Sequence, residues 1–256
     1  MISAEAIEKY IENRALRVLV YDLLDSTNTR AKEYAASSER ADFSPVLLVA
    51  REQSAGRGRL GRRFLSRAGC GIYFSLLYFT EGDLSDAVRV TTATASAVAL
   101  AIERVTGKPM MIKWVNDIYN EQGKVSGILA ETLPVGNKYA VIVGVGVNTG
   151  EISFPEELAM IASSIGDVNG EESRLIALIA NGILAYVSNP SDRSYMEAYR
   201  ARFMLLEKNV NLFRADELIC SGRVAGVDDD GGLLLIPEGE SKPIAVHSGE
   251  VTVRSR

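Results

Sequence analysis

The stretch from Gln53 to Ser66, QSAGRGRLGRRFLS, combines residue types that bind anions. Successive backbone N–H groups in a glycine-rich loop can form a concave anion site, because glycine tolerates positive φ and lets the chain approach a ligand closely. Arginine adds a planar, bidentate donor for carboxylate or phosphate. We therefore predict a loop for a carboxylate-bearing or phosphate-bearing ligand. Its glycines and arginines are Gly56, Gly58, Gly61, Arg57, Arg59, Arg62 and Arg63.

Two other interpretations fit the same letters. Gly56 to Gly61 matches the G-x-G-x-x-G of dinucleotide-binding folds, but those folds need a helix at the third glycine and an acidic residue about 20 positions later. Here RRFLSRAGC leads into the apolar stretch GIYFS instead, which argues against a dinucleotide site. A solvated basic turn is the second alternative, and the interleaved glycines favour an anion-binding loop over it.

Further polar residues stand at the ends of apolar stretches, where ligand sites are assembled on a rigid scaffold. Taken singly, each has an ordinary structural reading, such as a turn closed by the Asn and Asp side chains of KWVNDIY. Gly144 and Gly146 alternate with valines, and glycines in a strand often mark the close approach of a ligand. The polar candidates are Ser26, Thr27, Asn28, Gln53, Lys113, Asn116, Asp117, Lys124 and Asn148.

The composition argues against several other kinds of site. His247 is the single histidine and has no partner motif around it, so Ser-His-Asp and Cys-His catalysis have little support. Cys70 and Cys220 show neither metal-ligand nor disulfide spacing. The formal net charge of -5 argues against a general nucleic-acid or membrane-surface binder. The sequence contains neither a membrane span nor a secretory signal, so we expect a cytoplasmic protein.

The elements that must position these residues follow from hydrophobic patterns. The 256 residues, 47% of them hydrophobic, predict a large domain over 1–207 and a small one over 208–256. Beyond residue 208, short alternating stretches broken by DDDGG and PEGE indicate a small all-β module. We expect strands at 17–21, 45–52, 71–79, 110–119, 124–132 and 138–148. We expect helices at 3–14, within DSTNTRAKEYAASS, and at 85–106, 171–187 and 191–207.

Taken together, the motifs resemble those of the biotin protein ligases, the biotin–[acetyl-CoA-carboxylase] ligase family. DSTNTRAKE, REQSAGRGRLGRRFLS, GIYFS, KWVNDIY, KVSGIL and VGVGVN stand in the family's order, and the resemblance extends from Val18 to Val253. It implies an α+β fold, in which a mixed β-sheet catalytic domain flanked by helices, similar to class II synthetases, is followed by a small C-terminal SH3-like barrel. The same fold serves lipoate ligases, so fold alone does not decide the substrate.

Two positions depart from the family's usual pattern. Phe64 stands where tryptophan is common, and it lacks the indole N–H donor. Val115 replaces the proline of a Lys-Trp-Pro-Asn-Asp run, which loosens a preset turn. Neither change removes a charge, so we expect an effect on loop rigidity more than on activity. About 17 residues precede the first expected strand, too few for the helix-turn-helix domain of the family's repressors, so the resemblance is to the ligase-only type.

The resemblance implies a two-step reaction. Biotin's carboxylate attacks the α-phosphate of ATP and gives biotinyl-5′-AMP and pyrophosphate; a lysine ε-amine of a biotin carboxyl carrier protein then attacks the acyl phosphate and releases AMP. A cationic loop suits this chemistry, because two anions must be brought together while charge develops on the phosphoryl oxygens. Mg²⁺ is expected to be held mainly through the ATP phosphates. A homodimer is a further expectation, and neither nucleic acid nor a membrane is expected as a partner.

The roles of single residues come from the motif match alone. Lys124 is expected near the acyl-phosphate bridge, and Asp117 serves either the nucleotide or the incoming lysine amine. Biotin contacts are implied for Ser26, Thr27, Asn28, Gln53, Gly56, Arg57, Gly58, Arg59, Lys124 and Gly127. Nucleotide contacts are implied for Arg59, Arg62, Lys113, Asn116, Asp117 and Asn148, and catalytic roles for Arg57, Arg59, Lys124 and Asp117.

Overall fold

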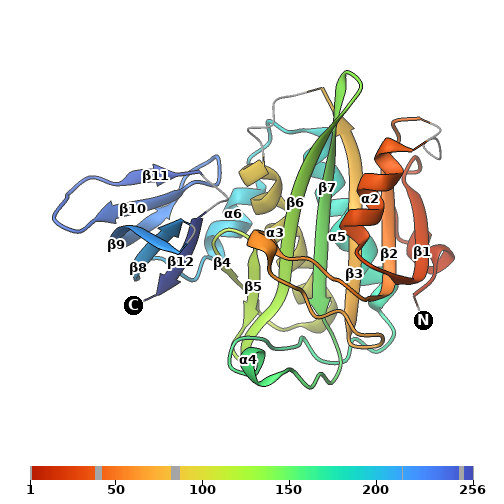
Figure 1. The fold of residues 1–256 in the computed structure, drawn as a ribbon, viewed down its shortest axis with the longest axis horizontal. Helices are drawn as coiled ribbons and strands as arrows, with labels where there is room; N and C mark the ends of the chain where they lie inside the picture. The colour runs from red at the N-terminus through yellow and green to blue at the C-terminus, as the bar shows by residue number, and fades with distance from the viewer. Residues whose placement is uncertain (1, 38–41, 82–86, 215, 248–250, 256) are drawn as a thin grey trace.

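The fold consists of two β-sheets with helices packed on the larger one (Figure 1). It is taken from a computed structural model, which describes residues 2–37, 42–81, 87–214, 216–247 and 251–255. No helix in these ranges is long and apolar enough to cross a membrane.

The larger sheet has seven strands in the order β1-β2-β3-β7-β6-β5-β4. β1 and β2 are parallel, and the other neighbouring pairs are antiparallel. This mixed sheet confirms the predicted fold class. The strands are β1 (Arg17–Leu24), β2 (Val46–Gln53), β3 (Gly71–Thr80), β4 (Met111–Lys113), β5 (Asp117–Asn120), β6 (Gly123–Val135) and β7 (Lys138–Asn148).

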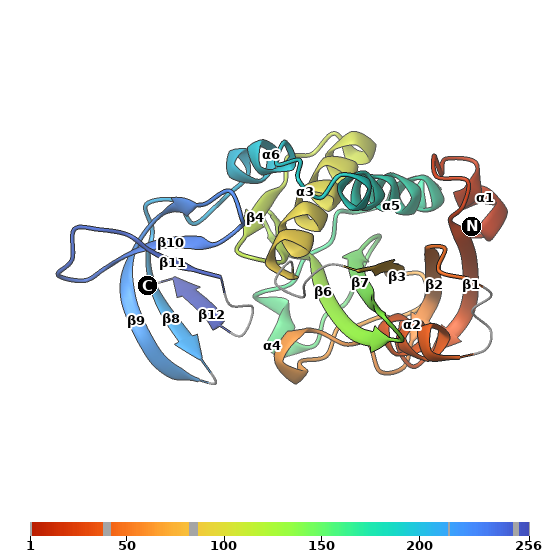
Figure 2. The same cartoon turned by 90° about the horizontal axis from the view of Figure 1, so that it is seen from above.

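Helices cover both faces of this sheet, which explains why β3 is buried over its first eight residues and reads as one apolar run (Figure 2). α3 and α5 pack on one face together with the main hydrophobic core, and α2 packs on the other. The helices are α1 (Ala4–Glu8), α2 (Thr27–Ala36), α3 (Ala87–Thr106), α4 (Glu156–Ala159), α5 (Glu172–Ser188) and α6 (Tyr195–Ala201), with a 3₁₀ turn η1 at Arg59–Gly61.

The alternation of residues along β7 creates a space beside α2. Ala140 and Ile142 pack beneath α2 in the smaller core. Gly144 and Gly146 follow on the same face, since successive side chains of a strand alternate between faces. The face of β7 that α2 covers therefore carries no side chains at Gly144 and Gly146. That bare part of the sheet can become the floor of a site.

The C-terminal residues form a separate five-stranded antiparallel sheet in the order β11-β10-β9-β8-β12. It is consistent with the predicted SH3-like module, although within the described strands β11 and β12 remain at opposite ends and the barrel does not close. Its small core includes Val210, Val224 and Leu235. The strands are β8 (Asn209–Arg214), β9 (Glu217–Val227), β10 (Leu233–Pro237), β11 (Ile244–Val246) and β12 (Val251–Ser255).

The turn between β9 and β10 fastens the small sheet to the larger unit. Arg200 and Arg89 form ion pairs with Asp229 at 2.5 Å and with Asp230 at 3.2 Å. The indole Nε1 of the buried Trp114 donates a hydrogen bond of 2.8 Å to the Gly231 carbonyl. The turn between β9 and β10 therefore contacts the segment between β4 and β5, which carries several of the predicted site residues.

Three predicted elements were wrong in extent. The first helix ends at Glu8 rather than continuing to residue 14, and the chain then makes a turn in which the Asn13 side chain accepts from the Ala15 N–H. The helix expected at 191–207 is confined to Tyr195–Ala201, because the carboxylate of Asp192 accepts from the Ser194 N–H and forms a local turn before it.

The strand expected over 110–119 is divided into β4 and β5. Trp114 and Val115 between them are both buried, which breaks the alternation of a strand, and the peptide bond that joins them is cis. The Trp114 side chain reaches the C-terminal sheet, so it leaves the plane of the larger one. The result is a bend that carries Asn116 and Asp117 to the start of β5.

Candidate active site

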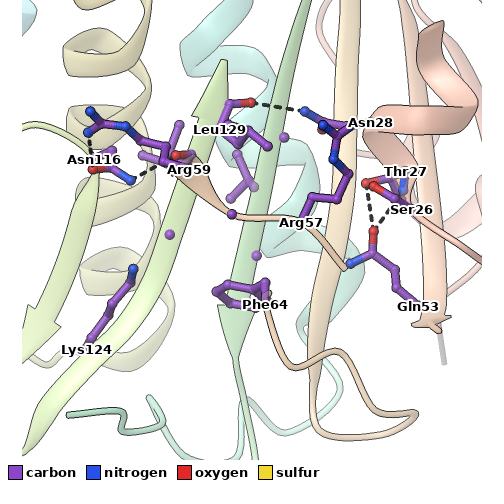
Figure 3. Close-up of a pocket in the computed structure, with 16 residues that line it drawn as sticks. Ser26, Thr27, Asn28, Gln53, Arg57, Arg59, Phe64, Asn116, Lys124 and Leu129 are labelled. Carbon is purple, nitrogen blue, oxygen red and sulfur yellow. Dashed lines mark hydrogen bonds between the residues drawn. The ribbon is translucent and has the colours of Figure 1, made fainter. Parts of the chain in front are cut away.

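A pocket lies over the bare part of β7 at Gly144 and Gly146, between the start of α2, the strand β6 and the arginine loop, residues 53–66 (Figure 3). Segments far apart in the sequence meet here. The predicted residues that line it are Ser26, Thr27, Asn28, Gln53, Arg57, Gly58, Arg59, Asn116, Lys124 and Gly127. The lining is completed by Phe64, Ile128, Leu129, Gly144, Val145 and Gly146.

The floor of the pocket requires glycine. A Cβ on Gly144 would lie 2.1 Å from the Asn28 Oδ1, and a Cβ on Gly146 would lie 2.5 Å from the Phe64 ring. Real Cβ atoms essentially never approach other atoms this closely. These glycines let an amide from α2 and an aromatic ring from the arginine loop lie directly against the sheet. We call this space the glycine-floored pocket.

One wall is a connected set of polar side chains at the start of α2. The Gln53 Oε1 accepts from the Thr27 backbone N–H at 2.8 Å, and the Gln53 Nε2 donates to Ser66 at 2.8 Å. The Ser75 hydroxyl donates to the Asn28 Oδ1 at 2.6 Å. Ser75, which is fully buried, was missed from the sequence. Because these groups hold one another, the wall presents fixed hydrogen-bonding groups to a ligand.

The arginine loop supplies the cations. The Arg59 Nη1 donates to the Asn116 Oδ1 at 2.8 Å, while its Nη2 is buried and has no hydrogen-bond partner among the described residues. Burial lowers the pKa of Arg59 from its usual value; Asp117 opposes this shift and Arg62 adds to it. A buried donor without a partner is costly, so this guanidinium suits an anionic ligand that the pocket would receive.

Two members of the predicted loop have other positions. Arg62 is exposed and does not line the pocket. Its carbonyl accepts from the Gly58 N–H at 2.8 Å, which closes the tight turn around η1. Gly56 packs within the loop, where a Cβ would lie 2.4 Å from the Phe64 carbonyl oxygen. Gly56 thus shapes the loop and does not line the pocket.

Lys124 in the opposite wall forms an ion pair with Asp117, which itself lies outside the pocket lining, with 2.6 Å between Nζ and Oδ1. They come from neighbouring strands, β6 and β5, and the pair lies beside Gly127, whose added Cβ would be 3.3 Å from the Lys124 Nζ. The Asn116 side chain donates to the Ile128 carbonyl at 3.0 Å, which orients its oxygen toward Arg59. Lysine, carboxylate, amide and guanidinium thus converge at one end of the pocket.

Lys113 and Asn148 lie outside the pocket lining. The Lys113 ammonium is 5.9 Å from the centre of the Tyr119 ring, and burial, with Asp117, raises the pKa of Tyr119 to about 12. The buried Asn148 side chain donates to the Ser163 carbonyl at 2.9 Å. It thereby fixes the segment whose Ile161 carbonyl accepts from the Lys124 N–H at 2.8 Å.

A second charged group, missed from the sequence, borders the pocket. The Glu131 carboxylate lies 2.7 Å from the Lys32 Nζ and 3.4 Å from the Arg57 Nη2, and it accepts from the Asn28 Nδ2 at 2.9 Å. Burial acts to raise the pKa of Glu131, but the hydrogen bonds from Lys32 and Asn28 and the charges of Lys32 and Arg57 outweigh it, so that pKa is lowered. An ionised carboxylate therefore contacts two residues of the pocket lining.

Comparisons with known proteins agree with this fold. Residues 20–148 match the sequence model of the Biotin/lipoate A/B protein ligase family. The chain is 34% identical over 228 residues to the bifunctional ligase/repressor BirA of Bacillus spizizenii, an alignment that covers 85% of this chain and 69% of the relative. It is 30% identical over 240 residues to the biotin–[acetyl-CoA-carboxylase] ligase of Mycobacterium tuberculosis, covering 88% and 85% of the two chains.

Among solved structures, the biotin protein ligase from Aquifex aeolicus in complex with biotin and ATP aligns with a TM-score of 0.76 and 28% identity, over 94% of this chain and 99% of that one. A mixed sheet that carries a cationic, glycine-floored pocket is thus the architecture of a ligase. The chain belongs to the biotin/lipoate A/B protein ligase family.

Proposed function

We propose that this chain is an ATP-dependent ligase that activates biotin as biotinyl-5′-AMP and transfers it to a lysine of a biotin carboxyl carrier protein. The observation that carries the proposal is the convergence of Arg57, Arg59 and Lys124 on one glycine-floored pocket (Figure 3). The names of the relatives from M. tuberculosis and A. aeolicus support biotin as the substrate.

The cations answer the main difficulty of the first step, in which a carboxylate must attack a phosphate. Arg57 and Arg59 neutralise the two anions and hold them together, which removes part of the entropic cost of the encounter. The buried Nη2 of Arg59 gains the partner that it lacks. Lys124 stabilises the charge that develops at the α-phosphoryl group, as a preorganised point charge.

The wall formed by Thr27, Asn28 and Gln53 suits the other end of biotin. Its hydroxyl, amide and backbone groups can bond the urea carbonyl and N–H groups of the ring system, while Ser26 lies at the start of α2 beside them. Gly127, Gly144 and Gly146 leave room for the rings against the sheet. In this arrangement the carboxylate of biotin extends toward the arginine loop.

The nucleotide is expected on the side of Asn116 and Asp117. Mg²⁺ commonly binds through one or two carboxylates together with substrate phosphates, so Asp117 and the phosphates of ATP form a suitable donor set for it. When bound, Mg²⁺ supplies positive charge to the phosphates. Lys113 and Asn148 lie outside the pocket lining, so we assign them supporting roles at this end, Asn148 through the segment that it holds beside Lys124.

Asp117 also fits the second step. Its carboxylate contacts Lys124 and can accept a hydrogen bond from the incoming lysine amine of the carrier protein, which orients that amine toward the acyl phosphate. We assign biotin and ATP binding and catalysis to a domain over residues 1–207, followed by a small SH3-like β domain over residues 208–256. A homodimer and a cytoplasmic location complete the proposal.

The test is transfer of biotin to an apo carrier domain by the purified full chain. With ATP and Mg²⁺, we expect a mass increase of one biotinyl group on a single carrier lysine, and biotinyl-5′-AMP when the carrier is omitted. The control replaces biotin with lipoate, because the family includes both ligases. Transfer of lipoate in place of biotin, or binding of biotin with no adenylate formed, would overturn the proposal.

A further inference from the structure

Glu131 occupies a position between the glycine-floored pocket and α2. It lies on β6, two residues beyond Leu129 and four beyond Gly127, so the three share the face of the strand that is turned to the pocket. Its side chain is 19% exposed. A carboxylate beside a pocket for anions repels the ligand. Its contacts with neighbouring residues therefore indicate what else it does.

The contacts of Glu131 divide between the two residues that border the ligand and one that does not. Asn28 and Arg57 line the pocket, and Lys32 stands one helical turn beyond Asn28 on α2. Lys32 makes the shortest contact, 2.7 Å, and so secures the carboxylate to the helix. Arg57, whose side chain is 46% exposed, makes the longest at 3.4 Å. Glu131 thus links α2, β6 and the arginine loop.

The amide of Asn28 is fixed in one orientation by these contacts. Its Nδ2 donates to Glu131 at 2.9 Å and to the Leu129 carbonyl at 3.3 Å, while its Oδ1 accepts from Ser75 at 2.6 Å. An ionised carboxylate can only accept a hydrogen bond, so it selects the Nδ2 side of the amide. The polar pattern of the pocket wall therefore depends on the charge at position 131.

We infer that Glu131 is a positioning residue for biotin, which holds the Asn28 amide and the Arg57 guanidinium in the arrangement that receives the ligand. This inference rests on the proposed function. Glu131 acts through those two residues and contacts neither Lys124 nor Asp117 in the described contacts of its carboxylate. Loss of its charge leaves Lys32 and Arg57 as like charges that repel, and the partly exposed Arg57 turns toward solvent.

The experiment compares Glu131→Gln, which keeps shape, with Glu131→Asp, which keeps charge. We measure KM for biotin and kcat for adenylate formation, with the melting temperature of each variant. Glu131→Gln should raise KM about tenfold or more, since hydrogen bonds to charged groups are among the stronger ones, and should change kcat less than KM. Glu131→Asp should retain a lower KM than Glu131→Gln. A role in packing alone predicts the reverse order.

Glu81→Gln is the matched control, because Glu81 forms an exposed ion pair with Lys138 at 2.9 Å away from the pocket lining, and its KM should equal that of the wild type. In an Arg57→Ala background, Glu131→Gln should raise KM for biotin by a smaller factor than it does in the wild type. This comparison also tests the inference if Glu131→Gln lowers the melting temperature. An unchanged or lower KM in Glu131→Gln, or fully additive effects, would overturn the inference. Absence of adenylation by the wild type would instead overturn the proposed function.

Discussion

Gly144→Ala and Gly146→Ala place the same methyl group on the same face of β7, and we expect them to fail in different ways. At Gly144 the new Cβ would lie 2.1 Å from Oδ1, 2.9 Å from Cγ and 3.2 Å from Nδ2 of Asn28. At Gly146 it would lie 2.5 to 3.0 Å from three atoms of the Phe64 ring. The outcome depends on which neighbour is free to move.

Asn28 is not free to move, because the residue is only 3% exposed and its amide is hydrogen-bonded to Ser75, Leu129 and Glu131. Moving it breaks these bonds, and overpacking of this kind costs about 1–3 kcal/mol of unfolding free energy. At about 2–4 °C per kcal/mol for a chain of this size, Gly144→Ala should lower the melting temperature by several degrees. It should also weaken biotin binding, since the pocket wall is displaced.

Phe64 stands on the arginine loop and is only half-buried, so its ring can rotate away from the new methyl group. Gly146→Ala should therefore leave the melting temperature within about 2 °C of the wild type, the usual range for a site outside the core. The displaced ring reduces the space of the pocket, and biotin affinity should fall about tenfold, or 1.4 kcal/mol.

The assay combines thermal unfolding without ligand and calorimetric titration with biotin. Phe64→Ala in the Gly146→Ala chain is the matched control: it removes the clashing ring and should restore part of the affinity, while in the Gly144→Ala chain it should restore none. The reasoning fails if both single variants lose the same stability, or if Phe64→Ala rescues both to the same degree.

Three further predictions concern charge. Arg59→Ala and Lys124→Ala should each slow adenylate formation by about 10²-fold or more in single-turnover kinetics, with melting temperatures close to the wild type; wild-type rates would contradict the assigned roles. The hydrogen bonds from Arg202 and Met110 and the charge of Arg202 outweigh burial and lower the pKa of Glu103, so its ionised form is favoured by folding. The difference in unfolding free energy between the wild type and Glu103→Gln should therefore be constant above pH 4.5, the unperturbed pKa of a glutamate. It should decrease as the pH falls below that value, which urea titrations at each pH would measure. The segment 56–66 should become less sensitive to protease when biotinyl-5′-AMP is bound, and equal cleavage with and without the adenylate would argue against ordering by the anion.

The sequence made the pocket predictable wherever its residues stand at the ends of apolar stretches. The arginine loop was recognisable because glycine and arginine alternate without acidic residues, and Gln53 and Lys124 could be found at strand ends. The two glycines of VGVGVN marked the floor correctly as a place of close approach. In each case a polar residue or a glycine stands where a buried strand would normally have an apolar side chain, and that departure can be seen in the sequence alone.

Residues inside strands could not be found in this way. Ser75 is a small hydroxyl within the apolar run GIYFSLLYF, and its only signal is that it interrupts that run. Glu131 stands two residues after Leu129 in a half-exposed strand, where a charged residue is ordinary and gives no signal of a site. Their importance depends on which strand and helix lie beside them, and that is a property of the tertiary structure.

A place at a strand end or in the loop does not by itself bring a residue into the pocket. Of the residues expected at the nucleotide, those outside the pocket lining are Arg62, Lys113, Asp117 and Asn148. The expected strand over 110–119 was wrong for a related reason. A long-range partner, Gly231, draws Trp114 out of the sheet, and no local pattern of hydrophobic residues reports a partner 117 positions away.

The Trp114 indole also bears on where the chain could be truncated. Deleting the last fifth of the chain would remove the Gly231 carbonyl that accepts from the buried Trp114 N–H, and would expose an aromatic face next to Asn116 of the pocket lining. A fragment ending at residue 207 would then carry a defect beside the pocket even if it folded. The domain boundary predicted from the sequence is therefore a poor site for truncation.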